Sequence, residues 1–218
     1  MVCSGYDIEE VPSSIEKLHK LVSLVLDMCR HLKSLPRSIC NLQHLRTLDL
    51  QYTSIEELPD DLGQLECLEK LDLTFTRVKH LPHSIGMLKR LETLLLGKCI
   101  VLEKLPDDLG HLESLVELDL KLCSNLRDIP NSICKLKRLK VLNLNGCRRL
   151  EKLPDDLGDL ESLQKLDIRD TGITYLPLCI PLMKSLKIYK PKLKLDDGFM
   201  SLCPHMILRS VKYKLFNI

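Results

Sequence analysis

The leucines of this chain follow one repeated spacing over most of its length. The unit reads Leu-x-x-Leu-x-Leu, then Cys or Thr three residues later, then a proline, as in residues 115–130. The prolines that close the units lie 23 or 24 residues apart, at Pro12, Pro36, Pro59, Pro82, Pro106, Pro130, Pro154 and Pro177. A unit this short cannot bury its own apolar face, but stacked copies cover one another and share a continuous core. The pattern therefore predicts a solenoid.

Each unit predicts one strand and one return. The last two leucines alternate at period two, which indicates a strand with one buried face. Seven such strands are expected, around Leu24/Leu26, Leu48/Leu50, Leu71/Leu73, Leu94/Leu96, Leu118/Leu120, Leu142/Leu144 and Leu166/Ile168. After each proline, apolar residues three apart predict a short helix or 3₁₀ turn, with the proline at its first position.

Identical units joined by long returns must run parallel, so the expected fold is α/β. It is a horseshoe-shaped solenoid with a parallel inner sheet and short helical or 3₁₀ turns on the outside. The period lies in the range of leucine-rich repeats. We expect the repeat array over residues 1–188, in about eight units of which the first is incomplete. Residues 189–218 are expected to be a non-repeat C-terminal segment and a candidate cap, with an edge strand at residues 211–215.

The ends of the array depart from the pattern. Residues 1–3 fall where strand leucines should be, and no polar cap precedes them, so we expect exposed apolar core there. At the other end, Tyr189 and Pro191 stand where the next strand leucines should be.

Four of the ten cysteines share one position of the unit, directly after the strand: Cys29, Cys99, Cys123 and Cys147. Thr53, Thr76 and Thr171 fill this position in other units. We expect it to face inward, so that a small and modestly polar side chain meets the backbone of the adjacent turn. Because the sequence contains no Cys-x-x-Cys pair, buried free thiols are a better interpretation than zinc ligands.

Composition excludes several functional classes. The net charge of +2 gives no general attraction to nucleic acid, and no stretch approaches the roughly 18 apolar residues of a membrane span. No secretory signal is visible, so we expect a cytoplasmic or nuclear location. The histidines are scattered and no phosphate-binding glycine motif occurs. We therefore expect no enzyme and no cofactor.

Charged residues recur on the outer side in two patterns. Paired acids follow alternate prolines at residues 60–61, 107–108 and 155–156, where they suit a helix N-terminus better than a metal site. A second position alternates in sign along the stack: Gln43, Glu66, Lys89, Glu113, Lys137, Glu161 and Lys184. We expect each of these charges to pair with both neighbours and to fix the register of the repeats.

The inner sheet is the candidate binding surface. One column of residues lies between the two strand leucines, and a second lies two residues after the second leucine. Together they supply the predicted protein-binding residues, which are Met28, Asp49, Tyr52, Asp72, Phe75, Leu95, Lys98, Asp119, Leu122, Asn143 and Asp167. Exposed apolar groups beside acids are typical of a surface that binds proteins. The alternative is that a concave face simply tolerates scattered apolar residues.

Two motifs carry a family resemblance. Ile-Glu-Glu-Leu-Pro at residues 55–59 follows Thr53, and Cys147-x-x-Leu-Glu-Lys-Leu-Pro154 is followed by x-x-Leu-Gly-x-Leu-x-x-Leu. These units resemble the leucine-rich repeats of plant intracellular disease-resistance receptors, above all those with an N-terminal TIR domain and a nucleotide-binding core. The likeness covers about residues 6–188. The chain is also similar to plant Ras-group-type leucine-rich-repeat proteins, which share the Leu-Pro-x-x-Ile-Gly unit.

The first resemblance implies a sensor and autoinhibitory region that acts in the defense response. Its partners would be a pathogen effector, a guarded host protein or the core domain of the receptor. The second resemblance implies a free-standing signalling scaffold that assembles other proteins. The chain itself contains neither a TIR nor a nucleotide-binding segment.

Overall fold

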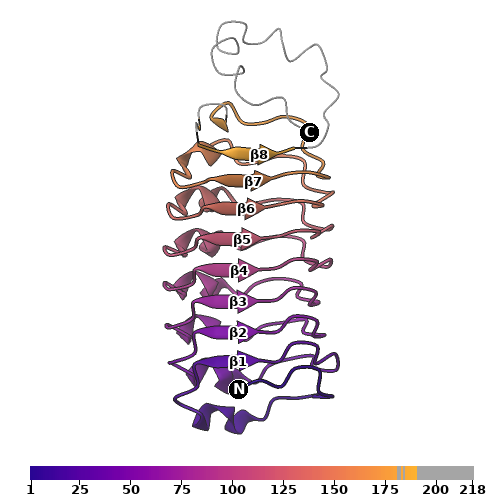
Figure 1. The fold of residues 1–218 in the computed structure, drawn as a ribbon, viewed down its shortest axis with the longest axis vertical. Helices are drawn as coiled ribbons and strands as arrows, with labels where there is room; N and C mark the ends of the chain where they lie inside the picture. Colours follow the sequence, from indigo (N-terminus) through magenta and orange to yellow (C-terminus); the bar gives the residue numbers. More distant parts are fainter. Residues whose placement is uncertain (181–182, 184, 191–218) are drawn as a thin grey trace, which may run out of the picture.

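The computed structural model describes residues 1–180, 183 and 185–190, in which eight strands form one parallel sheet whose order follows the chain (Figure 1). The strands are β1 (Ser23–Val25), β2 (Thr47–Asp49), β3 (Lys70–Asp72), β4 (Thr93–Leu95), β5 (Glu117–Asp119), β6 (Val141–Asn143), β7 (Lys165–Asp167) and β8 (Lys187–Tyr189). The sheet lines one side of the stack and the helical turns line the other. The predicted solenoid with a parallel inner sheet is confirmed.

The register places equivalent leucines side by side from strand to strand, as in Leu24 beside Leu48. The sheet has one strand more than expected, because β8 pairs with β7 through Ile188 beside Leu166. The last unit is thus shorter than its predecessors, and Ile188 takes the place that the 23-residue period gave to Tyr189. The predicted end of the array at residue 188 lies within β8. The predicted edge strand at residues 211–215 lies outside the described residues.

In the described residues, seven outer returns form 3₁₀ helices, which is one of the two expected forms. They are η1 (Ser13–Lys17), η2 (Arg37–Asn41), η3 (Leu62–Gln64), η4 (His83–Met87), η5 (Asp107–His111), η6 (Asn131–Lys135) and η7 (Leu157–Asp159). The proline was predicted at the first helical position. In the structure it lies before the helix instead. Pro12 is extended, with φ −67° and ψ 144°, and its carbonyl accepts the first helical hydrogen bond from Ile15 N–H at 3.0 Å.

The core runs without a break from Val11 to Ile180 and consists largely of leucine.

Glycine sets the distance between the outer turns. A Cβ on Gly110 would lie less than 3.0 Å from the backbone carbonyl oxygen of Ser132 in the next repeat, closer than real Cβ atoms come. The 3₁₀ turns therefore stack through direct contact of their backbones.

The predicted inward position after each strand is confirmed. Cys29, Cys99, Cys123 and Cys147 are all 0% exposed, and the nine cysteines of the described residues are free thiols. The Sγ of Cys99, Cys123 and Cys147 donates to the carbonyl of Leu73, Leu96 and Leu120 in the preceding repeat, at 3.0–3.1 Å. Burial raises the pKa of Cys99 to about 11 and that of Cys147 to about 12. Each thiol thus ties two repeats together.

The threonines at this position bond differently. Thr53 and Thr76 donate to the carbonyl of Leu50 and Leu73, in their own repeat, at 2.7 Å. The position therefore satisfies backbone carbonyls in both types of unit.

We call the outer position that alternates in sign from Glu66 to Glu161 the charge ladder. Its ion pairs point in one direction along the stack. Lys89 Nζ lies 3.0 Å from Glu113 Oε1, and Lys137 Nζ lies 3.5 Å from Glu161 Oε1, so each lysine reaches the following repeat. Each also donates to a backbone carbonyl there, at His111 or Asp159. Among the described residues no ion pair joins these lysines to the acid of the preceding repeat, so the prediction of pairing with both neighbours is wrong.

The paired acids lie at helix N-termini, as expected, with Asp61 and Asp156 at the N-cap of η3 and η7 and Asp107 and Asp108 in the first turn of η5, but they make no capping hydrogen bond. No side chain makes an N-terminal cap hydrogen bond at η1–η7. Instead the guanidinium of Arg37 binds Asp61, and His83 Nδ1 lies 2.6 Å from Asp108 Oδ2. The hydrogen bond with His83 lowers the pKa of the Asp108 carboxyl. The expected position is therefore confirmed without the capping bond, and two of these acids, Asp61 and Asp108, link neighbouring repeats.

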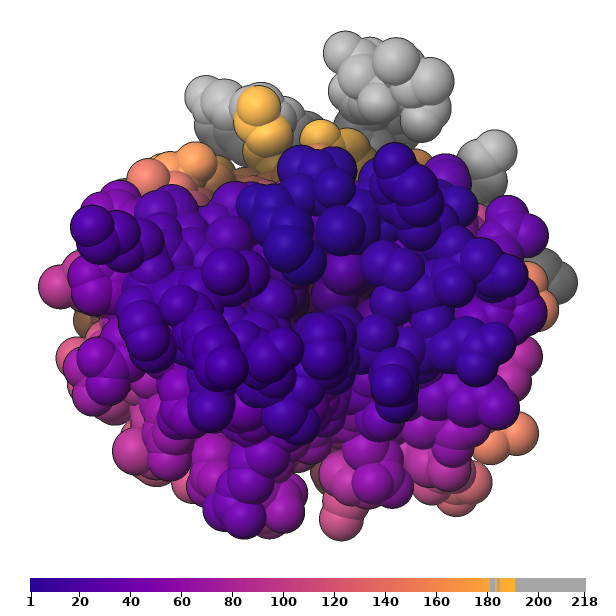
Figure 2. Space-filling view, turned by 90° about the horizontal axis from the view of Figure 1, so that it is seen from below, coloured from indigo at the N-terminus to yellow at the C-terminus, as the bar shows by residue number. Residues whose placement is uncertain are grey.

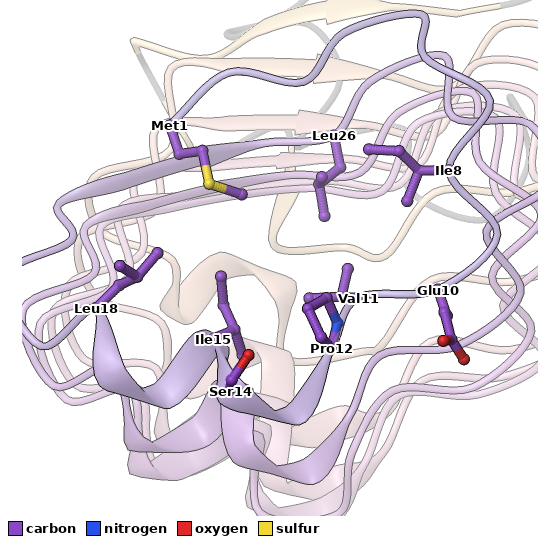
Figure 3. Close-up of a pocket in the computed structure, with 9 residues that line it drawn as sticks. All are labelled: Met1, Ile8, Glu10, Val11, Pro12, Ser14, Ile15, Leu18 and Leu26. Carbon is purple, nitrogen blue, oxygen red and sulfur yellow. The ribbon is translucent and has the colours of Figure 1, made fainter.

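The N-terminal end of the stack presents apolar side chains, as expected. Val2 bridges to Val25, and Cys3 N–H donates to Val25 C=O at 2.8 Å, so the first residues continue the sheet. Figure 2 views this end face, and Figure 3 shows an apolar pocket of about 270 Å³ beneath it. Val11, Ile15, Leu18 and Leu26 are among the side chains that line it.

Candidate protein-binding surface

The two predicted columns lie in different parts of the repeat. Strands are only three residues long, and the first column, with Asp49 in β2, is the last strand position. The second column, with Tyr52, lies in the turn that follows. This four-residue turn is closed by a hydrogen bond from Thr53 N–H to Leu50 C=O at 3.3 Å. The second column was expected on the strand face, and the structure places it at the edge of the sheet.

The turn residue has a left-handed backbone after each of the strands β1–β7. The φ angles are 59° at Met28, 58° at Tyr52, 61° at Phe75, 60° at Lys98, 61° at Leu122, 78° at Gly146 and 54° at Asp170. This region suits glycine, and any other residue in it costs about 1–2 kcal/mol. Sequence reasoning missed the conformation because these residues, apart from Gly146 and Asp170, carry no turn signal.

Hydrogen bonds between repeats hold this backbone in place. Tyr52 N–H donates to Thr74 C=O at 2.9 Å, and Phe75 N–H donates to Gly97 C=O at 2.8 Å. The ladder of parallel hydrogen bonds thus continues beyond the strands into the turns. The stack, rather than the local sequence, imposes the positive φ.

The acids of the first column bind the turn. Asp49 Oδ1 accepts Gln51 N–H at 3.1 Å, Asp72 Oδ1 accepts Thr74 N–H at 3.1 Å, and Asp119 Oδ1 accepts Lys121 N–H at 2.8 Å. Asn143 and Asp167 accept the N–H two residues later in the same way. Each polar member of this column therefore stabilises the turn of its own repeat, a packing duty that sequence reasoning did not assign to it.

Burial of this column is uneven. Asp72 and Asp167 are 5% exposed, whereas Asp49, Asp119, Asn143 and Leu95 are half-buried. Burial raises the pKa of Asp49 and of Asp119. For Asp167 burial acts in the same direction, but hydrogen bonds from Arg169 outweigh it, and the pKa is lowered.

The turn column forms a continuous row that we call the turn ladder: Met28, Tyr52, Phe75, Lys98 and Leu122. The rings of Tyr52 and Phe75 stack with centroids 4.4 Å apart and an angle of 21° between planes. Lys98 Nζ lies 4.1 Å from the centroid of the Phe75 ring. Because a stacked ring and a cation this close cannot share one face, Phe75 is covered on both faces.

Exposure of the turn ladder agrees with the prediction at three positions. Met28 is 48% exposed, and Tyr52 and Phe75 are each 36% exposed. Lys98 and Leu122 are half-buried. Leu122 lies over the next turn, where a Cβ on Gly146 would collide with it. The structure thus brings the apolar members of the second column together in one row.

Other kinds of site find no counterpart in the described part of the chain. There, no three side chains of His, Cys, Asp or Glu lie close enough together to hold a metal ion. Of the helices that the structure describes, none has the length and apolar character needed to cross a membrane.

The comparison with protein families assigns the chain. The model of the leucine-rich repeat region matches residues 25–149, more than half of the sequence. The chain belongs to the leucine-rich-repeat family, whose repeat regions are typically non-catalytic modules that bind proteins. No curated protein matches the chain.

Solved structures show the same fold. The leucine-rich repeat domain of the type III effector XopL is 31% identical with a TM-score of 0.78, over 85% of this chain and 66% of that one. A leucine-rich repeat protein of Leptospira interrogans is 29% identical with a TM-score of 0.75, over 85% of this chain and 47% of that one. The PEPR1–AtPEP1 structure is 23% identical with a TM-score of 0.59, over 84% of this chain and 26% of that one, and it is similar in fold alone. The chain therefore spans less than two thirds of the structures it matches.

Proposed function

We propose that this chain is the protein-recognition part of a plant immune receptor, where it senses a partner and helps to hold the receptor inactive. The observation that carries recognition is the exposed stacked pair of Tyr52 and Phe75 on the turn ladder. Aromatic anchors of this kind dominate the binding energy of many protein interfaces. The role in defense rests on the Cys-x-x-Leu and Thr-x-Ile units that resemble TIR-type receptors.

The partner that we propose is a pathogen effector, a guarded host protein or the core domain of the receptor itself. We also propose a cytoplasmic or nuclear location, where such partners meet the receptor. The runner-up is the Ras-group-type scaffold, which would bind host signalling proteins without a pathogen. The similarity to XopL concerns an effector domain and supports the recognition module rather than either role.

A capture experiment with a paired variant tests this function. The full chain and its Tyr52→Ala/Phe75→Ala variant are immobilised and exposed to leaf extracts with and without infection, and captured proteins are identified by mass spectrometry. We expect an effector or a defense protein on the parent chain, with binding weakened in the variant by about 2 kcal/mol or more. Met87→Ala, on the outer turn η4 and 60% exposed, is the control and should capture normally.

The outcomes separate the two roles. Host signalling enzymes captured equally from both extracts would favour the scaffold. Equal capture by the parent chain and by the Tyr52→Ala/Phe75→Ala variant would show that the turn ladder is not the site.

A further inference from the structure

The turn ladder does not need large side chains in order to fold. Gly146 forms the same turn, with φ 78° and its N–H bonded to Arg169 C=O at 2.8 Å. Glycine is therefore accepted at this position without loss of the hydrogen bonds between repeats. Tyr52 and Phe75 keep a strained backbone where glycine would relieve it, and strain of this kind is a pointer to function.

The turns are strongly basic. We take as a turn segment the last three residues of a turn and the residue after it, which gives six successive segments at residues 27–30, 51–54, 74–77, 97–100, 121–124 and 145–148. They contain five cations and one acid, which are Arg30, Arg77, Lys98, Lys121 and Arg148 against Asp27. Within the described residues, none of these five cations makes an ion pair. This edge of the sheet therefore carries free positive charge in a chain whose net charge is only +2.

The acids of the first column are less exposed than Arg77 and Lys121. Asp72 is 5% exposed and accepts Thr74 N–H, with Lys70 Nζ 3.7 Å away. Asp49 and Asp119 are half-buried and accept N–H groups of their own turns. In contrast, Arg77 and Lys121 are exposed. A partner that approaches from solvent meets the cations before the acids.

Apolar groups lie among these cations. Ile100, in the turn segment of Lys98, is 56% exposed, and it adds to Met28, Tyr52 and Phe75. The edge thus offers exposed apolar contacts together with several donors that suit carboxylates. This inference rests on the proposed function of protein recognition. We propose that the turn ladder and its flanking cations bind an acidic segment of a partner protein, and that this segment inserts an aromatic or long aliphatic side chain.

A protein segment fits this surface better than a nucleic acid. Single-stranded nucleic acids bind through bases that stack on open aromatic faces. Phe75 has no open face, because Tyr52 stacks on one side and Lys98 covers the other. The five cations are also spread over six repeats, so the electrostatic attraction complements scattered carboxylates.

Selection from a random dodecapeptide display library on the immobilised full chain tests the chemistry. The selected peptides are then synthesised with a fluorescent label, and their affinity is measured by anisotropy. We expect them to be rich in Asp and Glu with at least one aromatic or long aliphatic residue. Their affinity should fall several-fold when the salt concentration rises from about 50 to 200 mM.

Variants locate the binding. Tyr52→Gly/Phe75→Gly keeps the turn and should weaken binding at least about ten-fold, as should Arg77→Glu/Lys121→Glu. Met87→Ala/Lys135→Glu, on the outer turns η4 and η6, should bind like the parent. Circular dichroism confirms that each variant is folded.

Three outcomes would overturn the proposal: selected peptides that are basic or uncharged, acidic peptides that bind all variants equally, or a labelled oligothymidylate that binds tighter than the peptides. These experiments also distinguish a failure of this inference from a failure of the proposed function. Capture of a defense protein through a non-acidic segment would refute this inference alone. Acidic peptides bound at the turn ladder, with no defense partner captured, would refute the proposed function alone.

Discussion

Gly110 lies directly against the backbone carbonyl of Ser132 in the next repeat, with no room for a side chain between them. Gly86 has the same relationship to Asp108. The outer turns are thus packed as closely as their main chains allow. A single added carbon at this contact has to push two repeats apart.

Gly110→Ala should therefore destabilise the protein by about 1–3 kcal/mol, the usual cost of overpacking. Thermal unfolding followed by circular dichroism measures the loss. Gly97→Ala is the matched control, because a Cβ there meets its nearest atom at 3.5 Å, an ordinary contact. Equal melting temperatures for the two variants would show that the repeats separate easily.

The left-handed turns reverse a familiar order of stability. At most positions alanine is more stable than glycine by about 0.5–1 kcal/mol. At Phe75, where φ is 61°, the Phe75→Gly variant should be more stable than the Phe75→Ala variant by about 1 kcal/mol, since glycine removes the strain. Urea titration of both variants measures the difference. Met87→Gly and Met87→Ala provide the comparison, and at this position the alanine variant should be the more stable one. If alanine is more stable than glycine at both positions, the turn at Phe75 is not strained.

The buried thiols should make the protein sensitive to alkali. Burial raises the folded-state pKa of Cys99 from 9.0 to about 11, so the folded chain keeps this proton after the unfolded chain has lost it. The stabilisation is complete below about pH 9 and disappears as the pH rises toward 11, which should lower the free energy of unfolding by about 2 kcal/mol.

Cys99→Thr tests this dependence, since threonine fills the same position in other repeats. The variant should lose part of the decline between pH 9 and 11, measured by urea unfolding. Cys67→Ser, at a half-buried cysteine that follows η3, should leave the decline unchanged. A parent chain with flat stability over this range would contradict buried thiols at the repeat contacts.

The charge ladder predicts an effect that depends on salt. Lys137→Glu removes the pair with Glu161 and places Glu113, residue 137 and Glu161 in a row of like charges. The loss should be about 1 kcal/mol at low salt and should shrink as salt is added. Lys137→Gln separates the causes, because it removes the charge but retains a donor for the carbonyl of Asp159. A loss equal in both variants would assign the effect to the missing pair with Glu161, and neither to the hydrogen bond nor to repulsion between like charges.

Much of the fold could be predicted because it depends on a period. Leucine spacing alone located β1–β7, the outer turns and the inward cysteines, since each recurs in every repeat. The eighth strand was missed because a shorter last unit shifts Ile188 into the place expected for Tyr189. A period predicts a regular repeat well and predicts its last member poorly.

The candidate surface was predicted only in part. Exposure of Met28, Tyr52 and Phe75 followed from their place outside the leucine pattern. Their left-handed backbone could not be predicted, because it comes from hydrogen bonds to the next repeat rather than from local preference. The acids Asp72 and Asp119 looked like surface charges, although they serve the backbone of the turn.

The self-sufficient main chain of the turns has a consequence for protein engineering. Since inter-repeat hydrogen bonds and strand-end acids fix the path of the main chain, the side chain of the turn residue can be changed while that path is kept. Seven such positions, from Met28 to Asp170, follow one another along the stack. Neighbouring side chains of this row touch, as Tyr52 and Phe75 do, so they have to be chosen together. New specificities can then be designed on the row without redesigning the fold.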